Sequence, residues 1–382
     1  MSVTVEPVVT RRHQKQFMQL AWDLYAGDPH WAPPLRQNLR EMVNFDPSPF
    51  YDTNEIQCFV AYKDGKPAGR VAAILNNGHI ERYKERRGFF GFFESVDDQE
   101  VANAVFDAAR DWLKERDVLL IRGPANPSLN HECGLLIDGF DSMATFMMTY
   151  NPPYYADLIE GYGFRKVEDM YAFWGNLEML ETLDPKLKFV VDEAKRRFNP
   201  VLRPINKKKF TEEIRMFLDI YNKSLVATWG FVPMSDAEIN VMAQGLKHLL
   251  VPEMTTVCEV EGKPVGAVFG LLDYNPLIKK IDGRLFPFGF LRLLWGKKKI
   301  KRVRLISTNV LPEFQRWGIG LVLLERLIPD ALKWGMEEAE FSWVLESNHL
   351  SRATLERGGA KKTKTYRMYD YAPTEPTAEA KS

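Results

Sequence analysis

The chain repeats itself once, and this repeat constrains its fold more than any other feature. Residues 64–71 (DGKPAGRV) reappear as residues 261–268 (EGKPVGAV), with Gly65 and Gly262 standing 197 positions apart. Two more short segments recur at nearly the same spacing: residues 6–8 as 203–205, and residues 160–163 as 356–359. Three matches in one order favour two copies of a single fold.

Each copy reads as strand, helices, hairpin, strand, helix, strand, helix and strand, the hairpin turning at the Gly-Lys-Pro segment. This succession predicts an α/β architecture in which helices flank a mixed sheet. We expect the first copy over residues 1–180 and a charged helical connector over 181–199. The second copy should span 200–371, and a disordered tail rich in Pro, Thr, Glu, Ala and Lys should span 372–382.

In the second copy a strand runs into a helix through a loop that contains two glycines. Residues 304–310 are rich in β-formers and residues 321–327 are apolar and helical. The first N–H groups of a helix have no partner within the helix, so they attract anions. Gly318 and Gly320 let the backbone approach a phosphate closely. The loop therefore predicts a pyrophosphate-binding site.

The spacing Gln-x-x-Gly-x-Gly in this loop, preceded by Val-x-Pro, resembles the acyl-CoA-binding motif of the GNAT acyltransferases. No Lys-Ser or Lys-Thr follows Gly320, so the loop is not the phosphate-binding loop of a nucleoside triphosphatase. In the GNAT family the fourth and fifth strands splay apart, pantetheine enters the gap, and a fourth-strand N–H faces the thioester carbonyl. The resemblance implies acyl-CoA or acetyl-CoA as co-substrate, held by Asn309, Val310, Leu311, Gln315, Arg316, Trp317, Gly318, Ile319 and Gly320.

A second part of the family pattern follows near the C-terminus. Asn348, Ser351, Leu355, Gly359 and Ala360 fit the register Asn-x-x-Ala-x-x-x-Tyr-x-x-x-Gly-Phe. The resemblance adds Asn348 and Ser351 to the expected donor site, although an asparagine in this place is more often a helix cap.

Leu355 departs from the family pattern in a way that affects the mechanism. Many relatives carry there the tyrosine that protonates the leaving thiolate. That role must pass to Tyr366, Tyr369 or water, or the thiolate leaves unprotonated.

Three residues are candidates for the group that takes the proton of the amine. Glu346 ends the predicted fifth strand close to the expected thioester and is our first choice, with a plain helix cap as the alternative. His131 and Glu132 are weaker candidates, because a loop His beside a Glu is more often a satisfied surface pair. They lie in a turn-rich insertion of the first copy, residues 123–134, which we expect to be an ordered loop.

The first copy lacks the glycine loop. After its expected fourth strand, residues 89–93, it runs Glu-Ser-Val-Asp-Asp-Gln into a helix. An aspartate at a helix start caps the helix and repels a polyanion. We therefore expect a degenerate first copy that binds no CoA and shapes or covers the acceptor site.

The composition excludes several classes of protein. Fifty-one Lys and Arg balance fifty-one Asp and Glu, so no overall field favours nucleic acid. Cys58, Cys133 and Cys258 are widely spaced, so we expect reduced thiols and no metal. We find no signal-peptide core and no apolar run of about 18 residues. We expect a cytoplasmic protein, with peripheral contact at the inner membrane face left open.

A basic and aromatic insertion precedes the fourth strand of the second copy. Residues 279–304 contain ten Lys or Arg against Asp282 alone, interleaved with Phe and Trp. Such a segment fits a lipid headgroup boundary or the mouth of a tunnel for an apolar chain. An apolar lid or a dimer contact is an equally open interpretation.

Residues 28–34, 89–94 and 123–134 resemble bacterial tandem GNAT proteins of the ceramide synthase type, which implies N-acylation of a sphingoid base. The sequence thus predicts an acyl-CoA-dependent N-acyltransferase in which a primary amine attacks the thioester directly. N-acetylation of a small polar amine and a non-catalytic CoA-binding scaffold are the alternatives.

Overall fold

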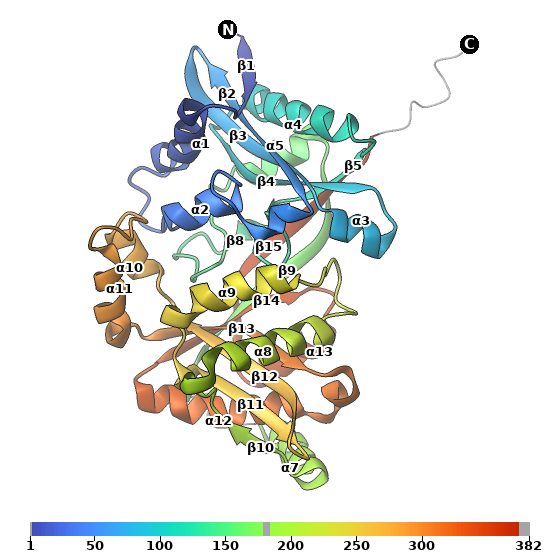
Figure 1. Cartoon of the computed structure of the whole chain (residues 1–382), viewed down its shortest axis with the longest axis vertical. Coiled ribbons are helices and arrows are strands. Elements are labelled where there is room, and N and C mark those ends of the chain that lie inside the picture. Colours follow the sequence, from blue (N-terminus) through green and yellow to red (C-terminus); the bar gives the residue numbers. More distant parts are fainter. Residues whose placement is uncertain (1, 179–183, 374–382) are drawn as a thin grey trace.

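The strands of both halves form one continuous mixed sheet in the computed structural model, which describes residues 2–178 and 184–373 (Figure 1). The first half contributes β1 (Val3–Pro7), β2 (Glu55–Lys63), β3 (Lys66–Leu75), β4 (Arg87–Ser95), β5 (Leu120–Gly123), β8 (Leu135–Asp138) and β9 (Arg165–Asn176). The second half contributes β10 (Val201–Arg203), β11 (Thr255–Val260), β12 (Lys263–Leu272), β13 (Arg302–Val310), β14 (Glu338–Leu345) and β15 (Lys361–Tyr371). A separate pair consists of β6 (Ala125–Asn126) and β7 (Glu132–Cys133).

The two halves exchange their last strands. The sheet order is β1-β2-β3-β4-β5-β15-β9-β14-β13-β12-β11-β10, with β8 paired to β15. The last strand of the chain, β15, therefore lies beside β5 of the first half, while β9 lies beside β14 of the second half. Neither half completes its sheet alone. The sequence repeat does not predict this exchange, and the sheet runs across the predicted boundary near residue 180.

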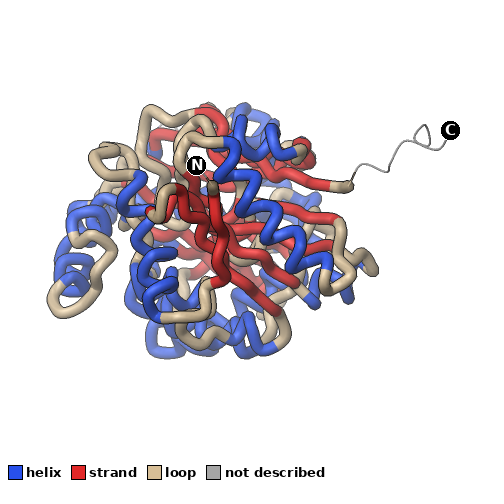
Figure 2. Tube along the Cα trace, turned by 90° about the horizontal axis from the view of Figure 1, so that it is seen from above, coloured by secondary structure: helices blue, strands red, loops and turns tan. Residues whose placement is uncertain are grey.

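Helices cover both faces of the sheet (Figure 2). The first half contains α1 (Arg11–Leu24), α2 (Arg36–Met42), α3 (Asn77–Tyr83), α4 (Gln99–Lys114) and α5 (Tyr155–Tyr162). The second half contains α7 (Pro185–Phe198), α8 (Phe210–Ser224), α9 (Asp236–Leu249), α10 (Asn275–Lys280), α11 (Gly289–Gly296), α12 (Ile319–Trp334) and α13 (His349–Arg357). The predicted α/β architecture is confirmed. Residues 374–382 of the predicted tail lie outside the described residues.

The repeated hairpin is repeated in detail. Asp64 and Gly65 have φ of 52° and 74°, and Glu261 and Gly262 have φ of 51° and 73°. Two consecutive positive φ values define the tight turn that matches the twist of a hairpin. Each hairpin also has a register shift at the same place, between Ala61 and Tyr62 in the first copy and 197 positions later in the second.

Separate apolar clusters fill the two faces of each half. In the first half one cluster lies under α4 and α5 and another under α1 and α2. In the second half one lies under α12 and another under α8 and α9. A fifth cluster is built by both halves and contains Cys133, Leu136, Met170, Leu345 and Tyr366. This shared cluster ties the halves together at the exchanged strands.

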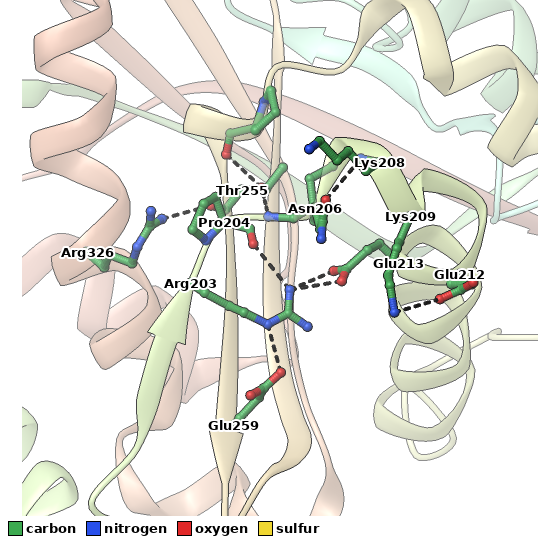
Figure 3. Close-up of polar contacts among 12 residues, drawn as sticks. Arg203, Pro204, Asn206, Lys208, Lys209, Glu212, Glu213, Thr255, Glu259 and Arg326 are labelled. Atoms are coloured by element: carbon green, nitrogen blue, oxygen red, sulfur yellow. Dashed lines mark hydrogen bonds and ion pairs between the residues drawn. The ribbon is translucent and has the colours of Figure 1, made fainter.

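Charged contacts fix the outer edge of the second half (Figure 3). Arg203 on β10 donates to both carboxylate oxygens of Glu213 on α8, at 2.8 and 3.0 Å, and to Glu259 on β11 at 2.8 Å. Arg326 of α12 donates to the carbonyl of Thr255 at 3.0 Å. These contacts hold α8 and α12 against strands β10 and β11 at the edge of the sheet.

Candidate active site

The strands β13 and β14 pair along only part of their length. Their parallel register runs from Arg302 opposite Glu338 to Leu305 opposite Phe341. Beyond that point β13 continues beside β12 as far as Val310, and β14 continues beside β9. The two central strands therefore diverge after residues 305 and 341, as the family resemblance implies for the strands that receive pantetheine.

A bulge lies where the strands diverge. Ser307 pairs with Phe269 and Leu305 pairs with Gly270, so Ile306 is an extra residue on β13. A bulge changes the direction in which backbone groups point. Ile306 and Ser307 are also half-buried, whereas residues 303–305 are buried. The sequence does not predict this bulge, because the bulge is defined by how β13 pairs with β12. The residues of β13 alone do not determine that pairing.

The predicted donor-facing residues of this strand make internal contacts. Asn309 is 1% exposed, and its Oδ1 accepts hydrogen bonds from the hydroxyls of Ser224 (3.0 Å) and Ser307 (2.8 Å). Val310 is buried in the core, and the N–H of Leu311 donates to the carbonyl of Val265 at 2.8 Å. These contacts fix the end of β13, and the role of the three residues toward a donor stays a prediction.

The glycine loop has the geometry of an anion site. A 3₁₀ turn, Pro312–Trp317, leads to Gly318, whose φ of 80° is left-handed, and α12 begins at Ile319. No side chain caps this helix start. Because the first N–H groups of a helix lack internal acceptors, they are available to a diphosphate. The predicted strand, loop and helix are therefore present in that order.

The loop is held in place by neighbouring residues. The Gln315 amide donates to the carbonyls of Ser224 (2.9 Å) and Val310 (3.0 Å), so its side chain is turned toward the strand. On the other side, Arg197 of α7 lies 3.6 Å from the ring centre of Trp317. Arg316 is exposed. The predicted connector helix thus supports the loop.

The second family segment forms a helix start. The Oδ1 of Asn348 accepts from the N–H of Ser351 at 3.1 Å, so Asn348 caps α13. Leu355 packs against the core of the second half. In the structure Asn348 therefore acts as a helix cap. A contact of Asn348 or Ser351 with CoA stays a prediction.

The first-choice base, Glu346, is already engaged. Its carboxylate lies 2.7 Å from the ammonium of Lys166 and accepts from the hydroxyl of Tyr171 at 3.2 Å. The hydrogen bond from Lys166 lowers the pKa of Glu346. A carboxyl group whose anion is stabilised in this way is a weaker proton acceptor.

The two candidate acids occupy different places. Tyr366 is fully buried, burial raises the pKa of its phenol, and its hydroxyl has no hydrogen-bond partner within the described part of the chain. Tyr369 donates to Glu160 at 3.0 Å in the core of the first half. Of the two, Tyr366 lies in the cluster shared by the halves, together with Leu345 at the end of β14.

A cavity of about 870 Å³ lies between the two halves. Its wall is formed by α2, α9 and α11, by the insertion after β5 and by the loop before α5. Most of that wall is apolar, for example Leu39, Met42, Phe50, Met148, Met242 and Leu293. Known ligand pockets span roughly 300–1,000 Å³, so this one is large.

His131 and Glu132 both line this cavity and are not bonded to each other. Nδ1 of His131 lies 2.9 Å from the hydroxyl of Ser128, and burial lowers the pKa of His131 to about 4. Burial raises the pKa of Glu132 to about 7, against the opposing effect of Arg304. The alternative of a satisfied surface pair therefore does not describe them.

Comparison with known proteins places the chain in a family. Residues 214–359 match the model of the acetyltransferase (GNAT) family. Protein YghO of Escherichia coli (strain K12) is 35% identical over 372 residues, covering 96% of this chain and 94% of that protein. Bacterial ceramide synthase of Caulobacter vibrioides (strain NA1000 / CB15N) is 32% identical over 380 residues, covering 97% of each. The chain belongs to the GNAT acyltransferases.

Solved structures show the same tandem GNAT fold. A tandem GNAT protein from the clavulanic acid biosynthesis pathway aligns with a TM-score of 0.56 at 12% identity, covering 98% of this chain and 100% of that one. A GCN5-related N-acetyltransferase from Sphaerobacter thermophilus aligns with a TM-score of 0.53 at 13% identity, covering 98% and 97%. The predicted enzyme class, an acyltransferase that uses acyl-CoA or acetyl-CoA, is confirmed by the family.

In the first half of this GNAT protein, the insertion after β5 fills the place where β4 and β5 diverge. Phe92 on β4 has φ of 52° at a register shift, and its N–H donates to the Oδ1 of Asn126 at 2.6 Å. A Cβ on Gly91 would lie only 1.9 Å from the carbonyl of Ala125, so the insertion backbone presses against β4. The expected aspartate cap is also present, since Asp98 accepts from the N–H of Glu100 at 2.9 Å.

Three further observations concern the described residues of this GNAT protein only. Residues 2–178 and 184–373 contain no group of three or more His, Cys, Asp or Glu placed to hold a metal ion. In the same residues no helix has the length and apolar character needed to cross a bilayer. Cys58, Cys133 and Cys258 are free and buried.

Proposed function

We propose that this enzyme transfers a long acyl group from acyl-CoA to the primary amine of a lipophilic acceptor, with a sphingoid base as the first candidate. The observation that carries the proposal is the apolar cavity of about 870 Å³ between the halves. A small polar amine leaves most of such a space unfilled, whereas an alkyl chain gains free energy from each methylene buried there. The 32% identity to bacterial ceramide synthase supports the same acceptor class.

The proposed donor site lies in the second half. The start of α12 at Gly318 and Ile319 offers unpaired N–H groups to the diphosphate, and the divergence of β13 from β14 receives the thioester arm. The amine nitrogen then attacks the thioester carbonyl, the C–N bond forms, and the C–S bond breaks with CoA as leaving group. Backbone N–H groups near the bulge at Ile306 are the candidates for stabilising the oxyanion.

A thiol-release assay separates this proposal from its alternatives. Purified enzyme is given acetyl-CoA or palmitoyl-CoA with a panel of amines that includes sphinganine and short polar amines. Release that requires both palmitoyl-CoA and sphinganine supports the proposal. Release with acetyl-CoA and a small amine selects small-molecule N-acetylation, and CoA binding without release under any combination selects the scaffold.

An exposed aromatic and basic patch next to the cavity is formed by Phe286, Phe288, Trp295, Lys298 and Lys299. Phe286, Phe288 and Trp295 are 72%, 74% and 75% exposed, and Phe286 also lines the cavity. The α10–α11 segment projects from one side of the molecule (Figure 1). Aromatic side chains enter a lipid interface while nearby cations meet phosphate. We propose that this patch contacts a membrane and receives lipophilic substrates there.

We expect the double substitution Phe288→Ser and Trp295→Ser to weaken binding to phosphatidylglycerol vesicles by roughly tenfold or more, because two interfacial aromatics are lost. Vesicle sedimentation measures this. Val9→Ser is the control, since Val9 is 71% exposed and lies between β1 and α1, outside the patch. Equal binding of the double variant and the control would contradict a membrane role for the patch.

We expect Gly245→Phe to shorten the chains that the enzyme accepts. Gly245 is an exposed residue of α9 that lines the cavity, and a Cβ there meets no atom within 4 Å, so a larger side chain can begin at this position without a clash. Activity with palmitoyl or sphinganine chains should fall by at least roughly tenfold relative to chains of eight carbons. Gly245→Ala is the control, and it should keep the chain preference. An unchanged preference for both substrates in Gly245→Phe would show that the cavity holds neither chain.

A further inference from the structure

The insertion after β5 of the first half reaches the second half. Nδ2 of Asn130 donates to the carbonyl of Val232 at 2.7 Å, and its Oδ1 accepts from the hydroxyl of Tyr221 at 3.1 Å. Tyr221 belongs to α8, and Val232 precedes α9. The insertion after β5 is therefore anchored to α8 and to the segment before α9, beside the proposed site of the second half.

Glu132 lies in this insertion, directly before a residue of the cluster that both halves build. The adjacent Cys133 is 2% exposed and belongs to the shared cluster with Leu345, the last residue of β14. Successive side chains of a strand point to opposite faces, and Glu132 lines the cavity. The same wall includes Phe146 and Met147, whose carbonyls each accept from Arg304 of β13 at 3.0 Å. This part of the wall thus rests directly on β13 and on the end of β14.

Glu132 differs from the other carboxylates of the cavity wall. Glu41 accepts from Gln37 at 3.2 Å, and Glu238 is part of the capping box of α9. Glu94 accepts from two tyrosine hydroxyls, at 2.9 and 2.7 Å, and from Arg70 at 3.3 Å. The carboxylate of Glu132 has no hydrogen bond or ion pair with any residue that the structure describes. It is therefore free to receive a group from a substrate.

We propose that Glu132 is the general base of the second half's reaction, accepting a proton from the acceptor ammonium so that the neutral amine attacks the thioester. This inference rests on the proposed N-acyltransferase function. Glu132 first takes one proton from the ammonium, which frees the lone pair of the nitrogen. The neutral amine then forms the C–N bond, the C–S bond breaks, and CoA departs as thiolate. The second proton that the nitrogen loses in becoming an amide goes to this thiolate, and Glu132 returns its own proton to water.

The electrostatic surroundings agree with this role. Burial raises the pKa of Glu132 to about 7, and Arg304 opposes that rise. Burial also raises the pKa of Cys133 to about 12 and lowers that of His131 to about 4, so both neighbours are neutral near pH 7. A carboxylate with a pKa near the working pH is an effective general base. A neutral His131 does not repel the incoming ammonium.

The test is Glu132→Gln in the full-length protein, with kcat and kcat/KM measured from pH 5 to 9. Wild-type kcat/KM should rise with pH through about 7, because Glu132 must lose its proton to act. The variant should lose that dependence, and kcat should fall by roughly 10²-fold or more. The affinity for CoA should not change, because the donor loop is intact. Exposed Glu81→Gln is the matched control.

Two outcomes would overturn the assignment. In the first, Glu132→Gln keeps the turnover and the pH dependence of wild type. In the second, Glu346→Gln loses both turnover and pH dependence while Glu132→Gln keeps them. A second measurement does not depend on turnover. Calorimetry with tetradecylamine and tetradecanol should show that wild type binds the amine more tightly and that Glu132→Gln loses this preference. Absence of any thiol release by wild type, with the amine preference present, would reject the proposed function and leave Glu132 as an ammonium-binding residue.

A stability measurement guards against misfolding as the cause of lost activity. The folded-state pKa of Glu132 is raised above its ordinary value of about 4.5, so wild type loses stability as pH rises between that value and about 7. Glu132→Gln does not lose stability in this way, because glutamine does not ionise. Its melting temperature at pH 8 should equal or exceed that of wild type, and a lower value would indicate a structural role.

Discussion

Gly320→Asp should weaken the binding of CoA by roughly two orders of magnitude, or about 2.7 kcal/mol, while the fold stays intact. Gly320 is the second residue of α12. An aspartate there adds negative charge where the diphosphate is expected, yet an acidic residue in the first turn is favourable to the helix itself. A Cβ at this position meets only the methyl of Thr308 at 3.6 Å, an ordinary contact. Calorimetry with CoA measures the change.

Gly320→Ala separates charge from size, since it adds the same Cβ without the carboxylate. It should bind CoA within roughly threefold of wild type. Gly318→Asp should also abolish binding, but it is a less selective change. Gly318 has φ of 80°, and a Cβ there would lie 2.5 Å from Val190 of α7, so the loop itself would be strained. Wild-type affinity in Gly320→Asp would place the diphosphate elsewhere.

The parts of this site that the sequence predicts are those set by neighbouring residues. The glycine loop, the helix that follows it and the repeated hairpin depend on turn chemistry within a few positions, as at Gly318 and Gly65. The aspartate that caps α4 is of the same kind. Such features need no knowledge of distant partners, and they appear in the structure where the sequence indicates.

The features that the sequence does not predict depend on contacts between distant segments. Glu346 stands at the strand end where a base is expected, yet Lys166 pairs with it only because β9 of the first half lies beside β14. The insertion residue Glu132 approaches the second half for a similar reason. No local pattern in the sequence indicates the exchange of the last strands. The sequence therefore favours Glu346 over Glu132 as the base, whereas the surroundings of the two carboxylates favour Glu132.

Arg304→Met should reduce the free energy of unfolding by about 3–5 kcal/mol, because it removes one partner from a buried charged network. Arg304 is 4% exposed. Its Nε donates to the hydroxyl of Ser342 at 2.8 Å, and the same hydroxyl donates to Glu340 at 2.6 Å. Loss of the guanidinium removes one of the two buried cations, Arg304 and Lys364, that oppose the charge of Glu340, which is 3% exposed. Urea denaturation should show a lower midpoint with an unchanged slope.

Arg302→Met is the matched control, because Arg302 is two residues away on the same strand but its ion pair with Glu338, at 2.7 Å, is about one-third exposed. An exposed pair contributes roughly 0–1 kcal/mol, so this variant should stay close to wild type. Adding Glu340→Gln to Arg304→Met should restore part of the lost stability, since the buried negative charge that has lost one of its opposing cations is removed. Equal stability of Arg304→Met and Arg302→Met would show that the network does not hold the halves together.

The same substitution should also affect the cavity. Arg304 donates to the carbonyls of Phe146 and Met147, which belong to the first half and line the cavity wall. Without these bonds the loop loses its attachment to β13 and keeps only its other hydrogen bonds to the second half, such as that from the N–H of Phe146 to Asp273, so this part of the cavity wall is held less firmly. Arg304→Met should therefore lower turnover at temperatures well below its melting transition, whereas its CoA affinity should persist, because the glycine loop is fixed independently through Gln315. Loss of both together would place Arg304 in the donor site instead.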